Sequence, residues 1–263
     1  MNGSFSNFQE TNLSIIIPTL NEEDYLPLLL GSIKKQNFAE GEEDKSSSSP
    51  SLSLGESSVY EVIVADANSK DKTVEIAKSY GCKVVPGGLP PKARNEGAKK
   101  ARGELFLFLD ADVVLPENSL EKFLKEFKKR NLDVASCFIK SQNKNLISKI
   151  YYNIFYNIGI LLLEKIRPSA MNFMLIKREL HQNIGGFEET IKFGEDVDYL
   201  TRASKIGKFA ILKSARILSS TRRFEKEGWI KTGLKYIFTT FYLLILGPIK
   251  SDIFKYKFGH YKK

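Results

Sequence analysis

Three short apolar runs in the first half of this chain each lead into polar and acidic residues, and this pattern strongly constrains the fold. The runs are Leu13–Ile17, Val62–Ala65 and Leu105–Leu109. Each run is bounded by turn or helix signals, so each is predicted to be a buried parallel strand followed by a helix. The repeated strand–helix order predicts an α/β fold with a mostly parallel central sheet flanked by helices.

An acidic residue follows each of the three predicted strands. Glu22 follows the first strand, Asp66 the second and Asp110-Ala111-Asp112 the third. Ligands of open α/β sheets bind beyond the carboxyl ends of the strands, so these acids are expected to gather at one site. Crowded carboxylates repel one another unless a metal ion or cationic groups lie among them. The pattern therefore predicts a divalent metal site that carries a phosphorylated ligand.

Asp110 and Asp112 are the candidate metal ligands. They lie two residues apart at a strand end, so their side chains are expected to point to the same side. Carboxylate oxygens favour Mg²⁺ or Mn²⁺, shared with substrate phosphates. An Asp-x-Asp sequence by itself is more often a turn or a helix cap. Its position directly after five apolar residues favours the metal interpretation here.

The other acids each have two interpretations. Asp66 is either a turn residue or the acceptor of an N–H from a nucleotide base. Glu22 is either a first-turn helix acid favoured by the helix dipole or part of the site. Glu195, Asp196 and Asp198 begin a later helix, where capping accounts for one or two of them. The alternative is that this group supplies a general base for an attacking hydroxyl.

Basic residues near two predicted helix starts complete the candidate site. Pro91 opens one helix, and Lys92 and Arg94 lie in its first turn, where cations oppose the dipole. A bound anion would explain this placement, and solvated surface residues are the alternative. Arg222 and Arg223 form a late basic pair, and the planar guanidinium groups suit a diphosphate.

Length and composition suit one domain with a terminal appendage, since the chain has 263 residues of which 42% are hydrophobic. We assign residues 1–12 to an N-terminal tail, 13–224 to the domain with the site, and 225–263 to an amphipathic or apolar helix with a basic tail. The Ser-rich residues 37–58 are too polar to fold alone and are expected to be a flexible insertion. The formal charge of +9 suits an anionic partner.

Two uncharged apolar segments, Ile150–Leu163 and Tyr236–Ile249, are each shorter than the roughly 20 residues that span a bilayer. Core packing is favoured for the first segment. For the second, core packing and membrane-surface contact are equally open. The N-terminus lacks the pattern of a signal peptide. Cys82 and Cys137 lack metal-ligand spacing, so reduced core thiols and a cytosolic environment are expected.

Several familiar chemistries have no support in the sequence. No G-x-G-x-x-G follows the first strand, and no Walker A sequence is present. The two histidines, His181 and His260, give little support to His-centred metal or triad catalysis.

The ordered motifs resemble the inverting glycosyltransferases of family 2, which have the GT-A fold. The matching motifs are Ser14–Glu22, Ala65–Thr73, Lys92–Gly97, Asp110–Asp112, Gly185–Phe187 and Glu195–Asp198. The resemblance covers roughly residues 13–224 and implies a GT-A nucleotide-sugar-binding fold with a C-terminal helical appendage. Asn68–Asp71 departs from the usual Gly-Ser-Thr-Asp, and the Ser-rich insertion is atypical. The Gln-x-x-Arg-Trp pattern of processive polysaccharide synthases is not found, so a single-transfer, hexosyltransferase-like enzyme is expected.

The resemblance also implies roles for individual residues. Asp112 would bind the metal, Asp110 would lie near the ribose or donor sugar and share the metal, and Asp196 would be the catalytic base. The implied nucleotide- and donor-binding residues are Pro18, Thr19, Glu22, Asp66, Lys92, Arg94, Asp110, Ala111, Glu195, Arg222 and Arg223. The implied cofactor is Mn²⁺ or Mg²⁺.

The expected donor is a UDP- or GDP-linked sugar, and the expected acceptor is a glycan, a lipid or a lipid phosphate. A lipid phosphate is already ionised, so Asp196 would then position groups instead of removing a proton. The apolar segments and the basic tail favour peripheral membrane contact at the cytoplasmic face, and no nucleic acid partner is expected. A non-catalytic nucleotide- or sugar-binding module of the same fold is the main alternative. A nucleotidyltransferase ranks third, because the chain lacks a Gly-rich, Arg-Lys opening loop.

Overall fold

The computed structural model describes residues 13–36, 60–143, 145–247 and 249. The strands are β1 (Leu13–Thr19), β2 (Tyr60–Asp66), β3 (Lys83–Pro86), β4 (Leu105–Leu109), β5 (Val113–Val114), β6 (Val134–Ser141), β7 (Phe173–Lys177) and β8 (Phe209–Ser219). The helices are α1 (Leu26–Lys34), α2 (Thr73–Ser79), α3 (Pro90–Lys100), α4 (Ser119–Lys129), α5 (Leu146–Ile150), the π-helical η2 (Tyr151–Tyr156), α6 (Asn157–Leu163), α7 (Arg178–Asn183), α8 (Glu195–Ile206), α9 (Arg222–Glu227) and α10 (Trp229–Leu246). The predicted tail 1–12, the insertion 37–58 and most of the basic tail lie outside the described residues.

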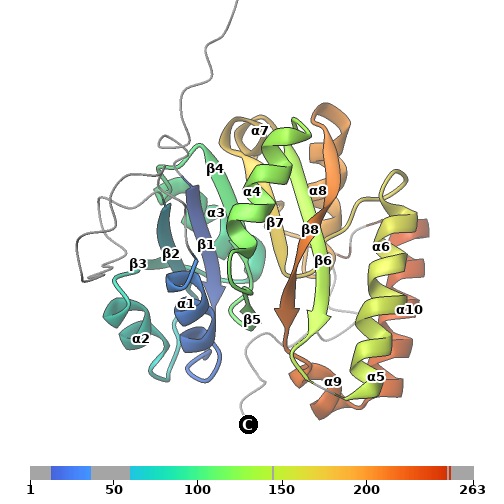
Figure 1. Cartoon of the computed structure of the whole chain (residues 1–263), viewed down its shortest axis with the longest axis horizontal. Coiled ribbons are helices and arrows are strands. Elements are labelled where there is room, and N and C mark those ends of the chain that lie inside the picture. The colour runs from blue at the N-terminus through green and yellow to red at the C-terminus, as the bar shows by residue number, and fades with distance from the viewer. Residues whose placement is uncertain (1–12, 37–59, 144, 248, 250–263) are drawn as a thin grey trace, which may run out of the picture.

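The eight strands form one sheet in the order β3-β2-β1-β4-β7-β6-β8-β5 (Figure 1). Strands β1, β2, β3 and β4 pair in parallel, as predicted, and β6 pairs in parallel with β8. Strand β7 runs antiparallel between β4 and β6, and β5 runs antiparallel to β8. The sheet is therefore mixed in its second half, which the strand–helix alternation of the first half did not predict.

Strand β8 corrects a second prediction. The sequence around Ser214 favours two strands, Phe209–Lys213 and Ala215–Ser219, but the structure has one continuous strand. Its register against β6 shifts between Cys137 and Phe138, so the residues that suggested a break form an irregularity within the strand.

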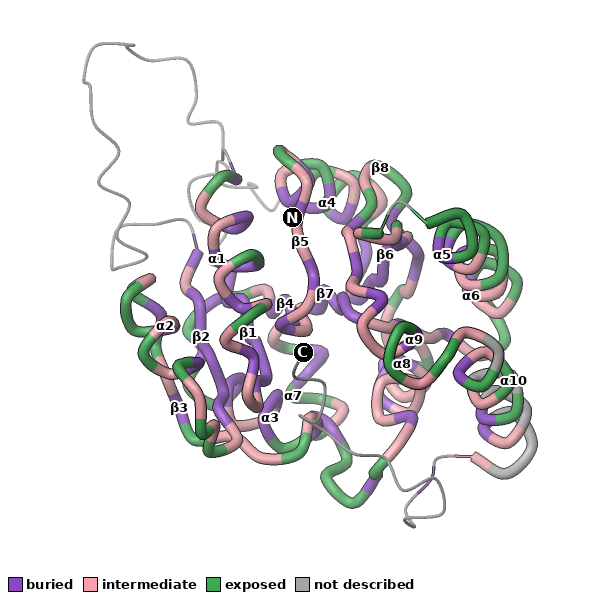
Figure 2. Tube along the Cα trace, turned by 90° about the horizontal axis from the view of Figure 1, so that it is seen from below, coloured by how far each residue is buried: buried purple, intermediate pink, exposed green. Residues whose placement is uncertain are grey.

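Helices cover both faces of the sheet. On one face, α1 and α4 bury apolar side chains such as Leu26 and Phe123 in a shared core. On the other face, α3, α7 and α8 contribute Ala93, Leu180 and Tyr199 to a second core. The buried strands lie between these layers in Figure 2. Cys82 and Cys137 are buried free thiols, as predicted.

Helix α3 lies so close to β1 that only glycine fits at one position. A Cβ atom at Gly97 would overlap Ile16 Cγ2. We expect Gly97→Ala to lower the free energy of unfolding by about 1–3 kcal/mol, because the added methyl group overpacks this contact. Urea unfolding measures the effect. The matched control is Gly159→Ala in α6, where a Cβ meets no atom within 4 Å, and equal stability of the two variants would contradict the expectation.

The segment Ile150–Leu163 corrects the prediction of core packing. It belongs to a helical run, Leu146–Leu163, formed by α5, η2 and α6, of which only 22% is buried. By length and composition this run could cross a membrane, although helices inside soluble proteins pass the same test. The second apolar segment lies mainly in α10, where Leu243 is buried and Phe238 is 62% exposed.

Candidate active site

The carboxyl ends of β1 and β4 open onto a cavity of about 260 Å³, which we term the central cavity. Most of the predicted site residues line it. They are Pro18, Glu22, Arg94, Asp110, Ala111, Asp112, Glu195, Asp196, Arg222 and Arg223. The predicted convergence of acids that are far apart in the sequence is therefore confirmed for Glu22 and the Asp110/Asp112 pair.

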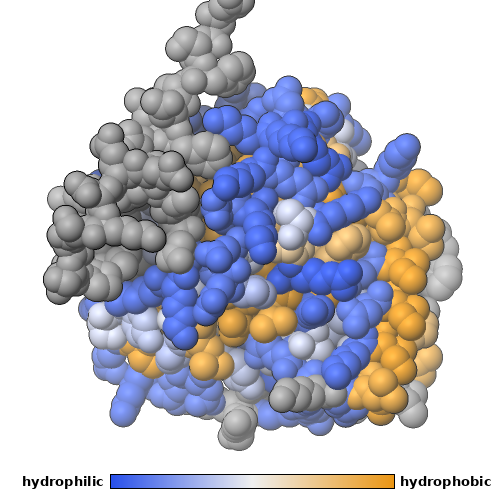
Figure 3. All heavy atoms as spheres, viewed as in Figure 1, coloured by the Kyte–Doolittle hydropathy of each residue, from blue (hydrophilic) through white to orange (hydrophobic). Residues whose placement is uncertain are grey.

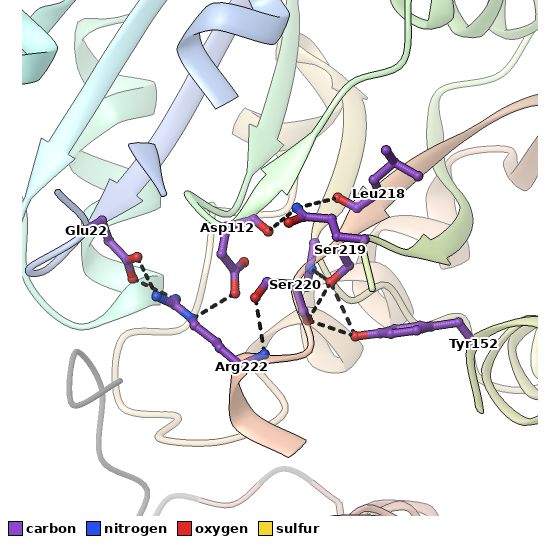
Figure 4. Close-up of polar contacts among 9 residues, drawn as sticks. Glu22, Asp112, Tyr152, Leu218, Ser219, Ser220 and Arg222 are labelled. Carbon is purple, nitrogen blue, oxygen red and sulfur yellow. Dashed lines mark hydrogen bonds and ion pairs between the residues drawn. The ribbon is translucent and has the colours of Figure 1, made fainter. Parts of the chain in front are cut away.

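Arg222, the first residue of α9, joins two of these acids (Figure 4). Its Nη1 and Nη2 donate to Glu22 Oε2 and Oε1 at 2.6 and 2.8 Å. Its Nε lies 3.0 Å from Asp112 Oδ2. Burial raises the pKa of Glu22 to about 7, and the hydrogen bonds from Arg222 oppose that increase. In this structure Arg222 therefore neutralises carboxylates, whereas the sequence suggested that it grips a diphosphate.

Arg94 joins two further acids in the same way. Its guanidinium lies 2.9 Å from Asp110 Oδ1 and 2.8 Å from Glu195 Oε1. The Arg94 side chain is only 5% exposed and lies over the ring of Phe187. The carboxylates of Asp110 and Glu195 raise the pKa of Arg94 above its usual range, although burial acts against this. Arg94 therefore ties the end of β4 to the first turn of α8.

The central cavity is close to electrical neutrality. Its acidic lining residues are Glu22, Asp110, Asp112, Glu195 and Asp196, and its basic ones are Arg94, Lys192, Arg222 and Arg223. A diphosphate would add negative charge to a site that has little positive charge to spare. A divalent cation bound with the phosphates would supply the balance.

Asp110 and Asp112 fit a metal that shares its coordination with a ligand. No group of three His, Cys, Asp or Glu residues able to hold a metal ion occurs in the described part of the chain. The two aspartates nevertheless offer hard oxygen ligands at the cavity, with side chains 34% and 18% exposed. Mg²⁺ is commonly held by one or two carboxylates together with substrate phosphates. The donor set thus suits Mg²⁺ or Mn²⁺ bound together with a phosphorylated ligand.

Three predicted residues do not line the central cavity. Thr19 Oγ1 donates to Asp66 Oδ1 at 2.9 Å, and the Ser69 backbone N–H donates to Asp66 Oδ2 at 2.8 Å. These bonds match the turn interpretation of Asp66, and its contact with a nucleotide base stays a prediction. Lys92 is exposed on α3, so its nucleotide contact also stays a prediction.

The first turn of α8 places Asp196 in the cavity wall. Gly194 has φ of 82°, and a Cβ there would lie 2.7 Å from Leu243 Cδ2, so glycine is required before the helix. Burial raises the pKa of Asp196 to about 7; Glu195 adds to this increase and Arg94 opposes it. A carboxylate with a pKa near neutrality suits a general base.

The Gly-Gly-Phe motif holds α8 in place through a residue that the sequence did not single out. Asn95 Oδ1 accepts from the Phe187 N–H at 2.8 Å, and Asn95 Nδ2 donates to the Phe187 carbonyl at 2.9 Å. The Phe187 ring stacks on Tyr199 of α8 with ring centres 3.8 Å apart. Asn95 lies inside the motif Lys92–Gly97, and that position was its only signal.

Tyr152 is a second lining residue that the sequence did not reveal. Its hydroxyl donates to the Ser220 carbonyl at 3.1 Å, two residues from Arg222 (Figure 4). It lies in the apolar segment that was predicted to pack in the core. Its side chain is buried, but it joins the exposed helical run to the cavity wall.

Comparison with known proteins identifies the family. The family model described as Glycosyl transferase family 2 matches residues 14–193. The chain belongs to glycosyltransferase family 2. The matched residues run from β1 nearly to the end of the loop before α8, and the match confirms the resemblance carried by the sequence motifs.

Curated relatives of this family member are glycosyltransferases. The poly(ribitol-phosphate) β-N-acetylglucosaminyltransferase TarS of Staphylococcus aureus is 30% identical over 138 residues, which are 49% of this chain and 21% of TarS. An uncharacterized glycosyltransferase of Haemophilus influenzae is 28% identical over 200 residues, 72% of this chain and 61% of that protein. The chain therefore spans about a fifth of TarS and about three fifths of the second relative.

Solved structures confirm the GT-A-type fold. Residues 1–349 of S. aureus TarS in complex with UDP give a TM-score of 0.58 at 23% identity, covering 82% of this chain and 62% of that one. The mannosyltransferase PcManGT of Pyrobaculum calidifontis, in complex with GDP-Man and Mn²⁺, gives a TM-score of 0.60 at 18% identity. This match covers 86% of this chain and 64% of PcManGT.

Proposed function

We propose that this chain is a metal-dependent inverting glycosyltransferase that moves a sugar from a UDP- or GDP-linked donor to a hydroxyl or lipid-phosphate acceptor. The observation that carries the proposal is the central cavity, in which Asp110, Asp112 and Asp196 converge with the buried Arg94 and the partly buried Arg222. The relatives that bind UDP or GDP-Man in solved structures support the donor class. Mn²⁺ in the PcManGT complex supports the cofactor.

Each cavity residue has a defined part in the proposed reaction. Asp112 and Asp110 would hold Mg²⁺ or Mn²⁺, and a bound cation would stabilise the negative charge of the leaving nucleoside diphosphate. Arg222 and Arg223 lie where they could bind its phosphate oxygens. Asp196 removes the proton from the acceptor hydroxyl, whose oxygen attacks the sugar on the face opposite the leaving group. One bond to the anomeric carbon forms as the bond to the diphosphate breaks, so its configuration inverts.

A membrane-associated acceptor is part of the proposal. The basic composition and the exposed helical run Leu146–Leu163 support an enzyme at the cytoplasmic face of a membrane. With a lipid phosphate as acceptor no proton needs to be removed, and Asp196 would orient the acceptor. The competing possibility is a nucleotide- or sugar-binding module without turnover, which would bind UDP or GDP yet release no product from a donor.

Calorimetric titration with UDP and GDP, each with and without Mn²⁺, tests the donor site. We expect one nucleotide to bind at least about tenfold more tightly with Mn²⁺, because the nearly neutral cavity needs a cation beside the phosphates. Binding of neither nucleotide with Mn²⁺ or Mg²⁺ would contradict the proposal. If the protein binds a nucleotide but neither hydrolyses nor transfers the sugar of the matching donor, even slowly, the non-catalytic module is favoured.

The pH dependence of turnover tests the role of Asp196. Its raised pKa means that the carboxyl is protonated below about pH 7 and serves as a base only above it. With a hydroxyl acceptor we therefore expect kcat/KM to rise with pH and to level off above about pH 7. Initial rates from roughly pH 5.5 to 8.5 measure this profile. A flat profile with a hydroxyl acceptor would contradict the role of Asp196 as the base, whereas a flat profile is expected with an acceptor that is already ionised.

A further inference from the structure

The helical run Leu146–Leu163 carries an exposed apolar stripe along its outer side. Its members are separated by one, three, four or seven positions, which are spacings that place residues on one side of a helix, and each is between 48 and 72% exposed. They are Leu146, Ile147, Ile154, Phe155, Ile158 and Leu162. Figure 3 shows hydrophobic side chains gathered along the edge of the molecule where Figure 1 places α5 and α6. We call these six residues the outer stripe.

The inner side of the same run is fixed to the domain by polar contacts. Asn157 Oδ1 accepts from the Ile139 N–H at 3.0 Å, and Asn157 Nδ2 donates to the Ile139 carbonyl at 2.8 Å. The amide therefore binds both backbone groups of a residue in β6, as a neighbouring strand would. Tyr152 adds its hydrogen bond to Ser220. Because these contacts hold the run along the domain, it is placed to lie on a membrane instead of crossing one.

The charges around the outer stripe suit an anionic surface. No Asp or Glu occurs between Asn145 and Leu163. Lys149 and Lys165 are exposed within and beside the run, and Arg167 follows. The next acid, Glu164, accepts a hydrogen bond from the Ile211 N–H at 3.0 Å, so its carboxylate faces the domain. An apolar face bordered by lysines is typical of helices that lie in the interface of anionic bilayers.

We propose that the outer stripe is a membrane-docking surface that inserts into the headgroup region of an anionic bilayer. This proposal rests on the proposed function, and it adds the direction from which a lipid-linked acceptor would reach the cavity. Tyr152, on the inner side of the docked run, lines the central cavity, so an acceptor carried by a lipid would reach the cavity from the membrane surface. Figures 1 and 2 place α10 beside α5 and α6, and α10 also exposes two large apolar residues, Leu234 and Phe238.

Cosedimentation with vesicles tests the docking surface. The full chain is mixed with vesicles containing phosphatidylglycerol and, in parallel, with vesicles of phosphatidylcholine alone. The test variant carries Phe155→Glu and Leu162→Glu, and the matched control carries Leu28→Glu and Ile206→Glu, which change two equally exposed apolar residues on α1 and α8. We expect the wild type and the control to sediment with the anionic vesicles, and the test variant to partition at least about tenfold less.

The outcomes separate this proposal from the proposed function. The test variant should keep wild-type hydrolysis of a soluble nucleotide sugar, because both substituted side chains are exposed and neither lines the cavity. An Asp112→Asn variant should still bind vesicles. Equal sedimentation of the test variant and the wild type would overturn the docking surface, as would a wild type that stays in the supernatant. A third outcome would also overturn the proposal. If the wild type is a dimer that does not bind vesicles, and the test variant is a monomer, the stripe binds a second copy of the chain instead of a membrane.

Discussion

Changing Asp112 to Asn is expected to lower kcat by about a thousandfold. The substitution removes the negative charge of the proposed metal ligand, which lies between β4 and β5, and it weakens the contact of this residue with Arg222. A neutral amide oxygen is a weaker ligand for Mg²⁺ or Mn²⁺, so charge on the leaving diphosphate would lose its main stabilisation. Release of UDP or GDP from the matching donor, measured across a Mn²⁺ titration, reports the loss.

The matched control for this variant is Asp133→Asn. Asp133 also forms an ion pair, 2.7 Å from Lys177 Nζ, but it precedes β6 at the opposite end of the sheet. We expect this control to keep kcat within about twofold, since it does not touch the cavity. Thermal unfolding of both variants separates lost chemistry from lost stability. If Asp112→Asn stays within tenfold of the wild type and responds to Mn²⁺ in the same way, Asp112 is not the metal ligand.

Arg94 and Arg222 explain how several acids can gather at one cavity. Carboxylates that are removed from water without a partner are strongly destabilising, and each arginine here forms ion pairs with two carboxylates. A cation on Asp112 would compete with Arg222 for Oδ2. Donor binding would then release the guanidinium towards the incoming phosphates, which reconciles the observed ion pairs with the predicted diphosphate contact.

The sequence predicted the part of the site that depends on which residues follow each strand. Strand β4 ends at the predicted residue, and β1 and β2 end two residues and one residue later than predicted, because short apolar runs bounded by turns have few other ways to be buried. The parallel pairing of these strands then brings Glu22 and the Asp110/Asp112 pair to one edge. A helix start was also predicted, since the three acids from Glu195 to Asp198 were expected to begin a helix and α8 begins at Glu195.

The sequence could not predict the partners of these acids. Glu22 and Arg222 are 200 positions apart, and their pairing depends on where β8 delivers the start of α9. Local patterns carry no such information. The antiparallel direction of β7 could not be predicted either, because the apolar pattern of a short strand does not depend on the direction in which the strand runs.

The apolar segments show a different limit of sequence patterns. A run such as Ile150–Leu163 has the composition of a core helix and also of an interfacial one, and composition does not distinguish them. The structure separates the two cases, because Asn157 and Tyr152 fix which side faces the domain. The favoured core assignment failed for this reason.

Changing Asp196 to Asn is expected to lower kcat with a hydroxyl acceptor by about 10²- to 10⁴-fold, because an amide cannot take the acceptor proton as the carboxylate would. The KM for the donor should change little, since Asp112, Arg94 and Arg222 remain in place. The residual activity should also lose its dependence on pH near 7, where the raised pKa of Asp196 places the wild-type transition. Steady-state rates for both substrates, measured at several pH values, test all three expectations.

Asp198→Asn is the matched control, because Asp198 lies in the same first turn of α8. Its carboxylate forms an ion pair with Arg202 at 2.8 Å and does not line the cavity. We expect this control to retain the wild-type kcat and pH profile. If Asp196→Asn keeps full activity towards a hydroxyl acceptor, Asp196 is not the base. If it keeps full activity only towards a lipid phosphate, the residue serves to orient an acceptor that arrives already ionised, and the enzyme needs no base for that transfer.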